Sequence, residues 1–160
     1  MMVNPDAQDV TFSESENSHV DKLCLQLNCN SDCVHVLRSM VAVMTVRAGL
    51  DELQSNRVAI AVDEVFANIA AHAYGGKPGR VEFEAQIVRR GDKSRELVFS
   101  FRDYASVCWA GSLEGIAAEQ PDAESLCSGG LGLKLICSVA DYCEHETLED
   151  GNRWQLGFVI

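Results

Sequence analysis

Hydrophobic and polar residues alternate in several short segments of the chain, and this period of two predicts β-strands with one face toward a core. A charged turn at residues 89–95 joins two such segments into an antiparallel hairpin, and the sequence EDGN at residues 149–152 joins two more. The four basic residues of the first turn predict a solvated loop, with a docking patch as the alternative. The expected strands cover residues 23–27, 81–87, 97–101, 142–147 and 153–160.

Longer apolar segments with polar interruptions predict three helices. The first is expected to run from an N-cap at Ser31 or Asp32 to about Ala48, where Gly49 ends it. Its many valines leave a strand as the alternative, but its length and the closing glycine favour a helix.

The second helix is expected to begin at Ser55 or Asn56 and to end at the glycine pair of positions 75–76. The third is expected over residues 131–142. Helices and hairpin-linked strands together predict an α+β fold, a two-layer sandwich in which helices cover one face of a mostly antiparallel sheet.

The same patterns predict how the chain is organised. Residues 1–18 are polar and acidic and lack an apolar period, which predicts a flexible tail before a single domain over residues 19–160. The pattern lapses over about 104–128, apart from one short helix expected near 113–118. A connection of this length inside a compact domain predicts a lid.

Three polar residues recur at every fourth position of the second expected helix. They are Glu64, Asn68 and His72, and their neighbours are almost all apolar. Residues four apart share one side of an α-helix, so the three side chains form a polar strip. A carboxylate and an amide one turn apart, roughly 6 Å, suit a proton acceptor and a metal ligand. The alternative for Glu64 and Asn68 is a satisfied polar pair inside the core.

A glycine-rich segment, SGGLGL at residues 128–133, opens the third expected helix. Such a segment lets backbone N–H groups approach phosphates at a helix N-terminus, where the helix dipole favours negative charge. Lys134 follows it and is expected either to contact phosphate or to face solvent. Together with the polar strip, this segment indicates nucleotide chemistry.

Composition and charge narrow the possible partners. A chain of 160 residues with 47% hydrophobic residues is expected to fold as one globular domain. Its net charge of -11 argues against nucleic acid and against anionic membranes, both of which need a positive surface. An acidic protein suits a basic protein partner, or a nucleotide whose charge is carried by magnesium.

Cysteine usage and hydropathy predict the compartment. The seven cysteines form no CxxC pair, and an odd number without an export signal predicts a reducing cytoplasm. Most are expected to be small buried residues, with a redox role for Cys29 and Cys33 as the alternative. No apolar run reaches the roughly 18 residues that cross a bilayer. We therefore expect a soluble cytoplasmic protein.

Three blocks of sequence occur in order between residues 20 and 160. They are Glu-x3-Asn-x3-His-Ala-Tyr at 64–74, Phe-Arg-Asp at 101–103, and the glycine-rich 129–133 with its trailing 136–141. In this order and spacing they resemble the anti-sigma-factor serine/threonine kinases of the GHKL (histidine kinase-like) ATPase superfamily. The resemblance implies a Bergerat-type ATP-binding sandwich that transfers the γ-phosphoryl group to a serine or threonine of a small antagonist protein. It also implies that a sigma factor is held inactive, often by a homodimer.

The resemblance also implies roles for individual residues. Asn68 would hold Mg2+ through its amide oxygen, and Glu64 would orient or deprotonate the attacking hydroxyl. Asp103 would accept a hydrogen bond from the adenine amino group, with a turn-capping aspartate as the alternative. His72 would be a ligand or phosphate contact, or else a hydrogen-bonding residue near the helix end. The remaining residues expected to contact ATP are Ala105, Gly129, Gly130, Leu131, Gly132 and Leu133.

The chain departs from the family pattern after Asp103. The family has a glycine two residues later, whereas this chain has Ala105. If the nucleotide loop needs a positive φ there, alanine costs about 1 kcal/mol. This departure leaves a second possibility, a partner-binding switch that keeps the fold with weak or no turnover.

Overall fold

The computed structural model of the protein describes residues 22–30, 32–106 and 130–160. In this part of the chain, a five-stranded sheet has the order β1-β2-β3-β5-β4, and all neighbouring strands are antiparallel. The strands are β1 (Lys22–Asn28), β2 (Arg80–Arg89), β3 (Arg95–Asp103), β4 (Tyr142–Leu148) and β5 (Gly151–Val159). All five correspond to the strands expected from the alternating pattern.

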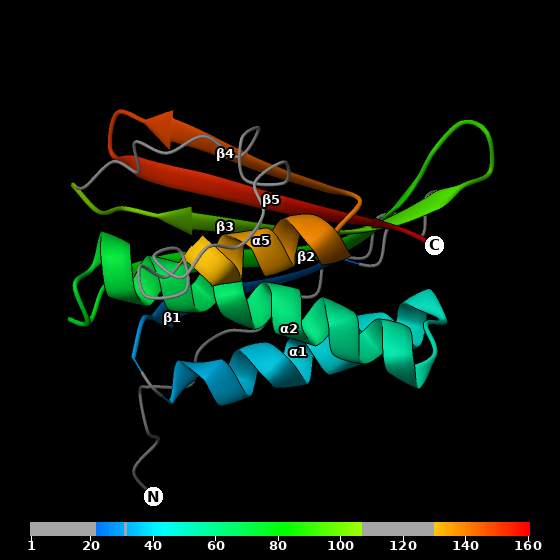
Figure 1. Ribbon diagram of the computed structural model, residues 1–160, viewed down its shortest axis with the longest axis horizontal. Helices are drawn as coiled ribbons and strands as arrows, with labels where there is room; N and C mark the ends of the chain where they lie inside the picture. Colours follow the sequence, from blue (N-terminus) through cyan, green and yellow to red (C-terminus); the bar gives the residue numbers. More distant parts are fainter. Residues whose placement is uncertain (1–21, 31, 107–129) are drawn as a thin grey trace, which may run out of the picture.

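The helices lie together on one face of this sheet (Figure 1). They are α1 (Cys33–Ala48), α2 (Glu52–Asn68), the π-helical turn η1 (Ile69–Ala73) and α5 (Gly130–Val139). The helix α2 lies between α1 and α5 and contacts both. The expected two-layer α+β sandwich is therefore confirmed, while the expected tail and the short helix near 113–118 lie outside the described residues.

The core lies between the helices and the sheet. Phe83, Phe99 and Phe101 are fully buried on the helix-facing side, with ring centroids of Phe83 and Phe101 5.0 Å apart. From the helices, Leu37 and Val62 are fully buried against this side. Burial of a side chain of this size stabilises the fold by roughly 1.5–3 kcal/mol, so the sheet and helices hold each other in place.

The first helix ends as expected but begins differently. Gly49 closes α1 with a left-handed φ of 76°, as the sequence indicated. At the other end Asp32 makes no side-chain cap. Asn30 acts there instead, because its Oδ1 accepts hydrogen bonds from the backbone N–H groups of Asp32 and Cys33. Ser31 lies outside the described residues.

The second helix begins earlier than predicted. Its N-cap is Asp51, rather than Ser55 or Asn56. Asp51 Oδ1 accepts from the backbone N–H of Gln54 at 2.7 Å, and Gln54 Oε1 accepts from the backbone N–H of Asp51 at 3.0 Å. This capping box satisfies two backbone donors that would otherwise lack partners, and it adds one helical turn.

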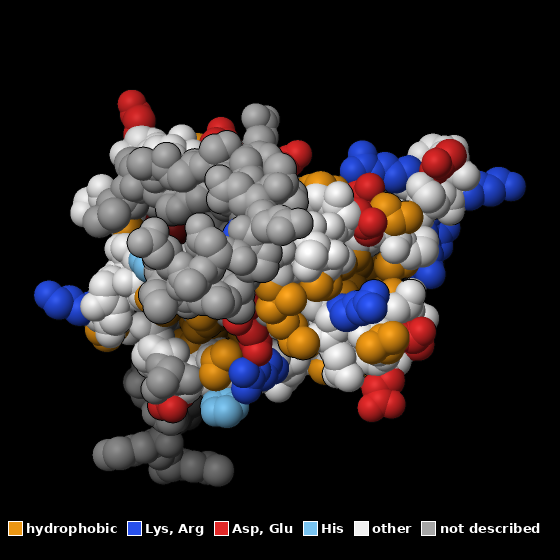
Figure 2. Space-filling view, viewed as in Figure 1, with side chains coloured by type: hydrophobic (Ala, Val, Ile, Leu, Met, Phe, Trp, Pro, Cys, Tyr) orange, Lys and Arg blue, Asp and Glu red, His pale blue; other side chains and the backbone are white. Residues whose placement is uncertain are grey.

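The surfaces of the two layers differ in character. Hydrophobic patches are visible over α1 and α2 (Figure 2), where Val36, Val43 and Ile60 are each 47% exposed. The opposite face of the sheet carries polar and charged side chains, since alternate residues of each strand point away from the helices. Along it, Lys22 pairs with Glu84 and Arg153 with Glu146.

Candidate functional site

Glu64 and Asn68 lie against the backbone of Gly132. A Cβ atom placed on Gly132 would lie 2.5 Å from Glu64 Oε2 and 3.9 Å from Asn68 Nδ2. The first distance is shorter than van der Waals contact allows, so only glycine lets α5 approach α2 this closely without moving the carboxylate. The structure thus brings the polar strip and the glycine-rich segment together, although they are more than sixty residues apart in the sequence.

The side-chain amide of Asn68 is available for a ligand. Its Nδ2 atom is buried and has no hydrogen-bond partner among the described residues. Buried polar atoms normally have partners, because an unpaired one costs about 1–3 kcal/mol. Rotation of the amide by 180° exchanges its oxygen and nitrogen with little steric change. The site therefore offers either an amide donor or a hard oxygen ligand beside the Glu64 carboxylate.

Asp103, at the end of β3, is 1% exposed and bonded through only one of its carboxylate oxygens. Its Oδ1 accepts from Ala105 N at 3.1 Å, from Asn152 N at 3.2 Å and from Asn152 Nδ2 at 3.1 Å. Its Oδ2 is buried and has no partner among the described residues. A carboxylate held this way presents a fixed acceptor, which suits an N–H donor of a ligand.

Ala105 adopts a conformation that costs no left-handed strain. It is 5% exposed, and the described non-glycine residues with positive φ comprise only Lys93. The penalty considered for a positive φ at Ala105 is therefore absent from this structure. Instead, the Ala105 N–H turns back to Asp103 and helps to fix its carboxylate.

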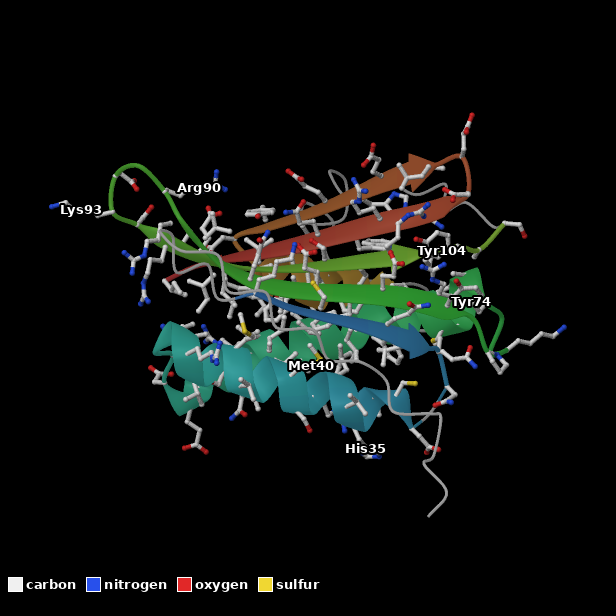
Figure 3. The ribbon with its side chains drawn as sticks, turned by 180° about the vertical axis from the view of Figure 1, so that it is seen from behind. His35, Met40, Tyr74, Arg90, Lys93 and Tyr104 are labelled. Carbon is white, nitrogen blue, oxygen red and sulfur yellow. The ribbon has the colours of Figure 1, made fainter. Side chains whose placement is uncertain are left out.

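Two tyrosines connect the end of the α2–η1 helix to the end of β3. Tyr74 Oη accepts a hydrogen bond from Tyr104 N at 2.9 Å and donates to the backbone oxygen of Arg80. Burial raises the pKa of the Tyr74 phenol, so this hydroxyl remains a donor. Figure 3 shows Tyr74 and Tyr104 near each other, at the end of the sheet opposite the hairpin of Arg90 and Lys93. The residues near Asn68 and near Asp103 are thus fixed relative to each other.

His72 lies in the π-helical turn η1, beyond the α-helical residues that carry Glu64 and Asn68. After Asn68 the helix changes to a π turn, in which Tyr74 N bonds to Ile69 O. A π turn contains more residues per turn than an α-helix, so the fourfold spacing of an α-helix does not apply within it. His72 is exposed.

The glycine-rich segment is described in part. Gly130, Leu131, Gly132 and Leu133 form the start of α5, whereas Gly129 lies outside the described residues. Lys134 follows, and its Nζ atom is buried without a hydrogen-bond partner among the described residues. The first backbone N–H groups of an α-helix have no partner within the helix, and both they and the Lys134 cation on α5 favour an anion.

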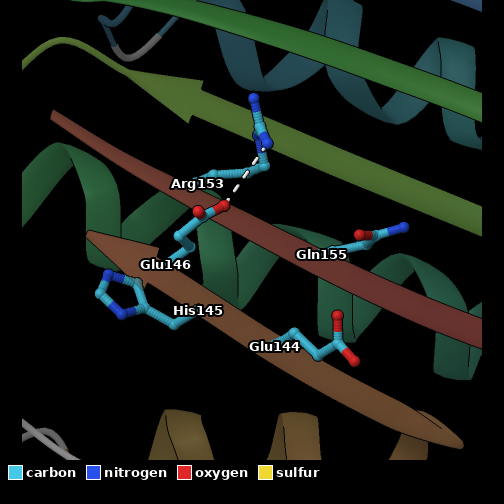
Figure 4. A pocket seen from close by; sticks show the side chains of 5 residues that line it. All are labelled: Glu144, His145, Glu146, Arg153 and Gln155. Carbon is cyan, nitrogen blue, oxygen red and sulfur yellow. Dashed lines mark hydrogen bonds and ion pairs between the residues drawn. The ribbon is translucent and has the colours of Figure 1, made fainter. Parts of the chain in front are cut away.

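A second depression lies on the opposite side of the sheet (Figure 4). It is lined by Glu144, His145, Glu146, Arg153 and Gln155. Two carboxylates and one guanidinium, already paired with Glu146, make it unsuited to a triphosphate. It is thus separate from the site at Glu64, Asn68 and Gly132.

Neither a metal cage nor a membrane span is found in the described part of the chain. Groups of three or more His, Cys, Asp or Glu side chains that could hold an ion do not occur there. No helix in the same residues is long and apolar enough to cross a bilayer. A magnesium ion at Asn68 would accordingly depend on ligand oxygens for most of its coordination.

Sequence reasoning missed three residues that build this site. Tyr74 was part of a family block but received no role, and Asn152 was assigned only to a turn. His145 was read as an ordinary strand residue, yet its Nε2 lies 3.1 Å from Asn152 Oδ1. The place of Asn152 at the start of a strand is a local signal in the sequence. Its partner Asp103 is 49 residues away, so the bond between them has no local signal.

The comparisons with known proteins concern the family and the fold. The family model described as histidine kinase-like ATPase domain matches residues 29–157. Comparison with curated proteins gave no match. A chain in the crystal structure of the SiaB–SiaC complex from Pseudomonas aeruginosa is similar, with a TM-score of 0.54 and 15% identity over 86% of this chain and 89% of that chain. At this identity, the likeness shows the fold alone.

Proposed function

Because the chain belongs to the histidine kinase-like ATPase domain family, we propose that it is an ATP-dependent serine/threonine protein kinase. In this proposal it acts as an anti-sigma factor and phosphorylates a small anti-sigma-factor antagonist. The observation that carries the proposal is the contact of the Gly132 backbone with Glu64 and Asn68. That contact supports a site where a carboxylate, an amide and phosphate-binding N–H groups act on one triphosphate.

The described residues fit an adenine nucleotide in three places. Asp103 Oδ2 is a buried acceptor that would receive the adenine amino group. The backbone N–H groups at the start of α5 would bind phosphate oxygens beside the Glu64 carboxylate, which lies against Gly132. Asn68 would hold Mg2+ through its amide oxygen, in the flipped orientation of the amide. The ion, when bound, supplies charge neutralisation between the β- and γ-phosphates.

Glu64 would act on the attacking hydroxyl of the partner protein. Its carboxylate takes the hydroxyl proton while the serine or threonine oxygen forms a bond to the γ-phosphorus. The bond from that phosphorus to the β–γ bridging oxygen breaks, and ADP leaves with its pair of electrons. The Gly132 backbone limits the movement of the Glu64 carboxylate, which supports a fixed position for this base.

A protein partner is supported by charge and by the fold. The similar solved structure is a complex of two proteins, SiaB and SiaC. This chain has a net charge of -11 and an exposed apolar surface over α1 and α2. A sigma factor and an antagonist are therefore the partners that we propose. The same apolar surface over α1 and α2 could also form a homodimer.

The deciding experiment is transfer of labelled phosphate from Mg-ATP. The purified protein is incubated with γ-labelled ATP and a small candidate antagonist, and Glu64→Gln is tested beside it. We expect label on a serine or threonine of the antagonist with the native protein and none with the variant, while both bind Mg-ADP. If the native protein binds Mg-ATP but labels no cognate antagonist, the kinase proposal is wrong.

The second candidate is a partner-binding switch without turnover. The observation that favours it is Ala105 in place of the family's glycine, which makes the loop after Asp103 less adaptable. Thermal unfolding in millimolar Mg-ADP distinguishes a switch that still binds nucleotide from one that does not. A ligand that binds only the folded state raises the midpoint temperature of unfolding. No rise would favour a switch that binds partners without nucleotide.

A further inference from the structure

We propose that His145 and Asn152 form a positioning pair, which orients the Asp103 carboxylate and so makes the site selective for adenine over bases with a carbonyl oxygen at the same position. This inference rests on the proposed nucleotide site. Both residues lie on the C-terminal hairpin, His145 on β4 and Asn152 on β5. Neither belongs to the motifs from which the site was first inferred.

The bonding of Asp103 is strongly asymmetric, and Asn152 is the main cause. Two of the three hydrogen bonds to Asp103 Oδ1 come from Asn152, through its backbone N–H and its side-chain Nδ2. Asn152 is only 3% exposed, so little water competes with these bonds. With Oδ1 occupied by three donors, the carboxylate cannot rotate without breaking them. Oδ2 therefore remains as the acceptor presented to a ligand.

His145 determines which way the Asn152 amide faces. Its Nε2 lies 3.1 Å from Asn152 Oδ1, so the amide oxygen faces the imidazole while the amide nitrogen faces Asp103. This arrangement requires a hydrogen on Nε2 of His145. If the amide were reversed, its oxygen would face Asp103 Oδ1 at hydrogen-bond distance without a proton between them, which is repulsive.

The imidazole is itself held in place by the hairpin. His145 is the cross-strand partner of Trp154, and their ring centroids are 4.5 Å apart. The start of β5 lies close to β3 because Gly151 has a φ of 141° and no side chain. A Cβ atom at Gly151 would lie 2.1 Å from Asp103 O. His145, Asn152 and Asp103 thus form one connected unit from the edge strand to the base site.

The chemistry of the base explains why orientation matters. Adenine carries an amino group where hypoxanthine carries a carbonyl oxygen, so a fixed acceptor attracts the first and repels the second. A carboxylate that is free to turn away from the base would soften this preference. Removing one charge-assisted hydrogen bond is therefore expected to lower adenine affinity about tenfold, with a smaller change for hypoxanthine.

The test measures binding of Mg-ADP and of Mg-IDP, the inosine analogue, to the full-length protein by titration calorimetry. His145→Phe retains an aromatic contact with Trp154 but has no N–H, while His145→Gln restores a donor. We expect His145→Phe to weaken ADP binding about tenfold and to reduce the ratio of the ADP affinity to the IDP affinity. We expect His145→Gln to recover most of the ADP affinity and most of this ratio. Recovery by glutamine would not be expected if His145 were important only for packing.

The matched control is His35→Phe, the same change on the exposed surface of α1, far from the hairpin (Figure 3). It should leave both affinities at the native value. If His145→Phe fails to fold, Asn152→Ala replaces it, since that change keeps the backbone bond to Asp103 and removes the side-chain amide that joins Asp103 to His145. A native ADP-to-IDP ratio in the folded variant overturns this inference alone. No ADP binding by the native protein overturns the proposed function as well.

Discussion

The two ends of α2 differ in how completely their polar groups are paired. At the N-terminal end, Asp51 and Gln54 satisfy each other's backbone donors in a capping box. Nearby, Arg95 donates to the backbone oxygen of Ala48, and Arg90 bonds to Glu96. At the C-terminal end the α-helix gives way to a π turn, and the buried amide of Asn68 has no partner among the described residues.

This difference agrees with the proposed function, in which a ligand binds at the C-terminal end of α2. Three buried polar atoms lack partners in the described part of the chain, on Asn68, Asp103 and Lys134. Two belong to the site residues and the third to the helix that contacts them. Each unpaired atom costs about 1–3 kcal/mol, so the fold is less stable than full pairing would make it. A nucleotide that bonded to these atoms would recover that free energy.

The largest expected effect is on turnover, from Glu64→Gln. This change keeps the size of the side chain but removes the proton acceptor, so phosphate transfer should fall by about 10²–10⁴-fold. The affinity for Mg-ADP should change little, because the chemical step needs the base and binding does not. Single-turnover transfer from γ-labelled ATP measures the rate of phosphate transfer, and calorimetry measures the affinity for Mg-ADP. Equal losses of rate and affinity would contradict the role of Glu64 as the proton acceptor.

A smaller loss of turnover is expected from Gly132→Ala. The new methyl would displace the Glu64 carboxylate, which is 2.5 Å from its position, and a misplacement of about 1 Å lowers rates by about 10²-fold. Since the methyl meets only the end of the Glu64 side chain and alanine favours helices by about 1 kcal/mol, the free energy of unfolding should not fall by much. Gly91→Ala is the control, because no atom lies within 4 Å of its added carbon.

Asp103→Asn should weaken the binding of Mg-ADP by roughly 10–100-fold, without abolishing folding. Three donors fix an oxygen at the Oδ1 position, so the new NH2 group must take the Oδ2 position. There it would oppose the adenine amino group and lose a charge-assisted hydrogen bond of about 1.5–3 kcal/mol. An affinity equal to that of the native protein would show that adenine does not bind at this carboxylate.

At the opposite end of α2, Asp51→Ala should affect stability alone. Loss of the N-cap is expected to lower the free energy of unfolding by about 1 kcal/mol. Urea unfolding measures this, and calorimetry with Mg-ADP should give the native affinity. A change in nucleotide affinity would show that the two ends of α2 are coupled, which would break the distinction drawn between them.

The smallest effect concerns pH and a partly buried thiol on β4. Burial raises the pKa of Cys143 from 9.0 to about 12. In the unfolded chain this thiol loses its proton at lower pH than in the folded one, so it stabilises the fold below pH 9 and loses this contribution as the pH rises toward 12. Urea midpoints at pH 7 and 10 should therefore differ more for the native protein than for Cys143→Ala. Equal differences would contradict the raised pKa.

Features with a local signal could be predicted from the sequence. The alternating runs identified all five strands, and Gly49 identified the end of α1. The start of α2 was missed although its signal is local. Asp51 and Gln54 have the spacing of a capping box, but Leu53, 63% exposed, disturbs the apolar period.

Non-local features could not be predicted in the same way. The spacing of Glu64 and Asn68 placed both correctly on one side of α2, whereas His72 lies in a π turn that no simple period shows. The bonds from Asn152 to Asp103 depend on the register of β3 with β5, which pairs these two residues across 49 positions. Registers between strands distant in sequence are determined by the packed sheet.

The order of the strands also has a consequence for synthesis. β5 is paired on both sides, with β3 and with β4, yet it is formed by the last residues of the sheet to leave the ribosome. Until residue 159 has emerged, one edge of β3 has no neighbour from its own chain. Its apolar residues Leu97, Phe99 and Phe101 would then be open to strands of other nascent chains. Truncation before β5 should therefore give an aggregating product rather than a smaller folded domain.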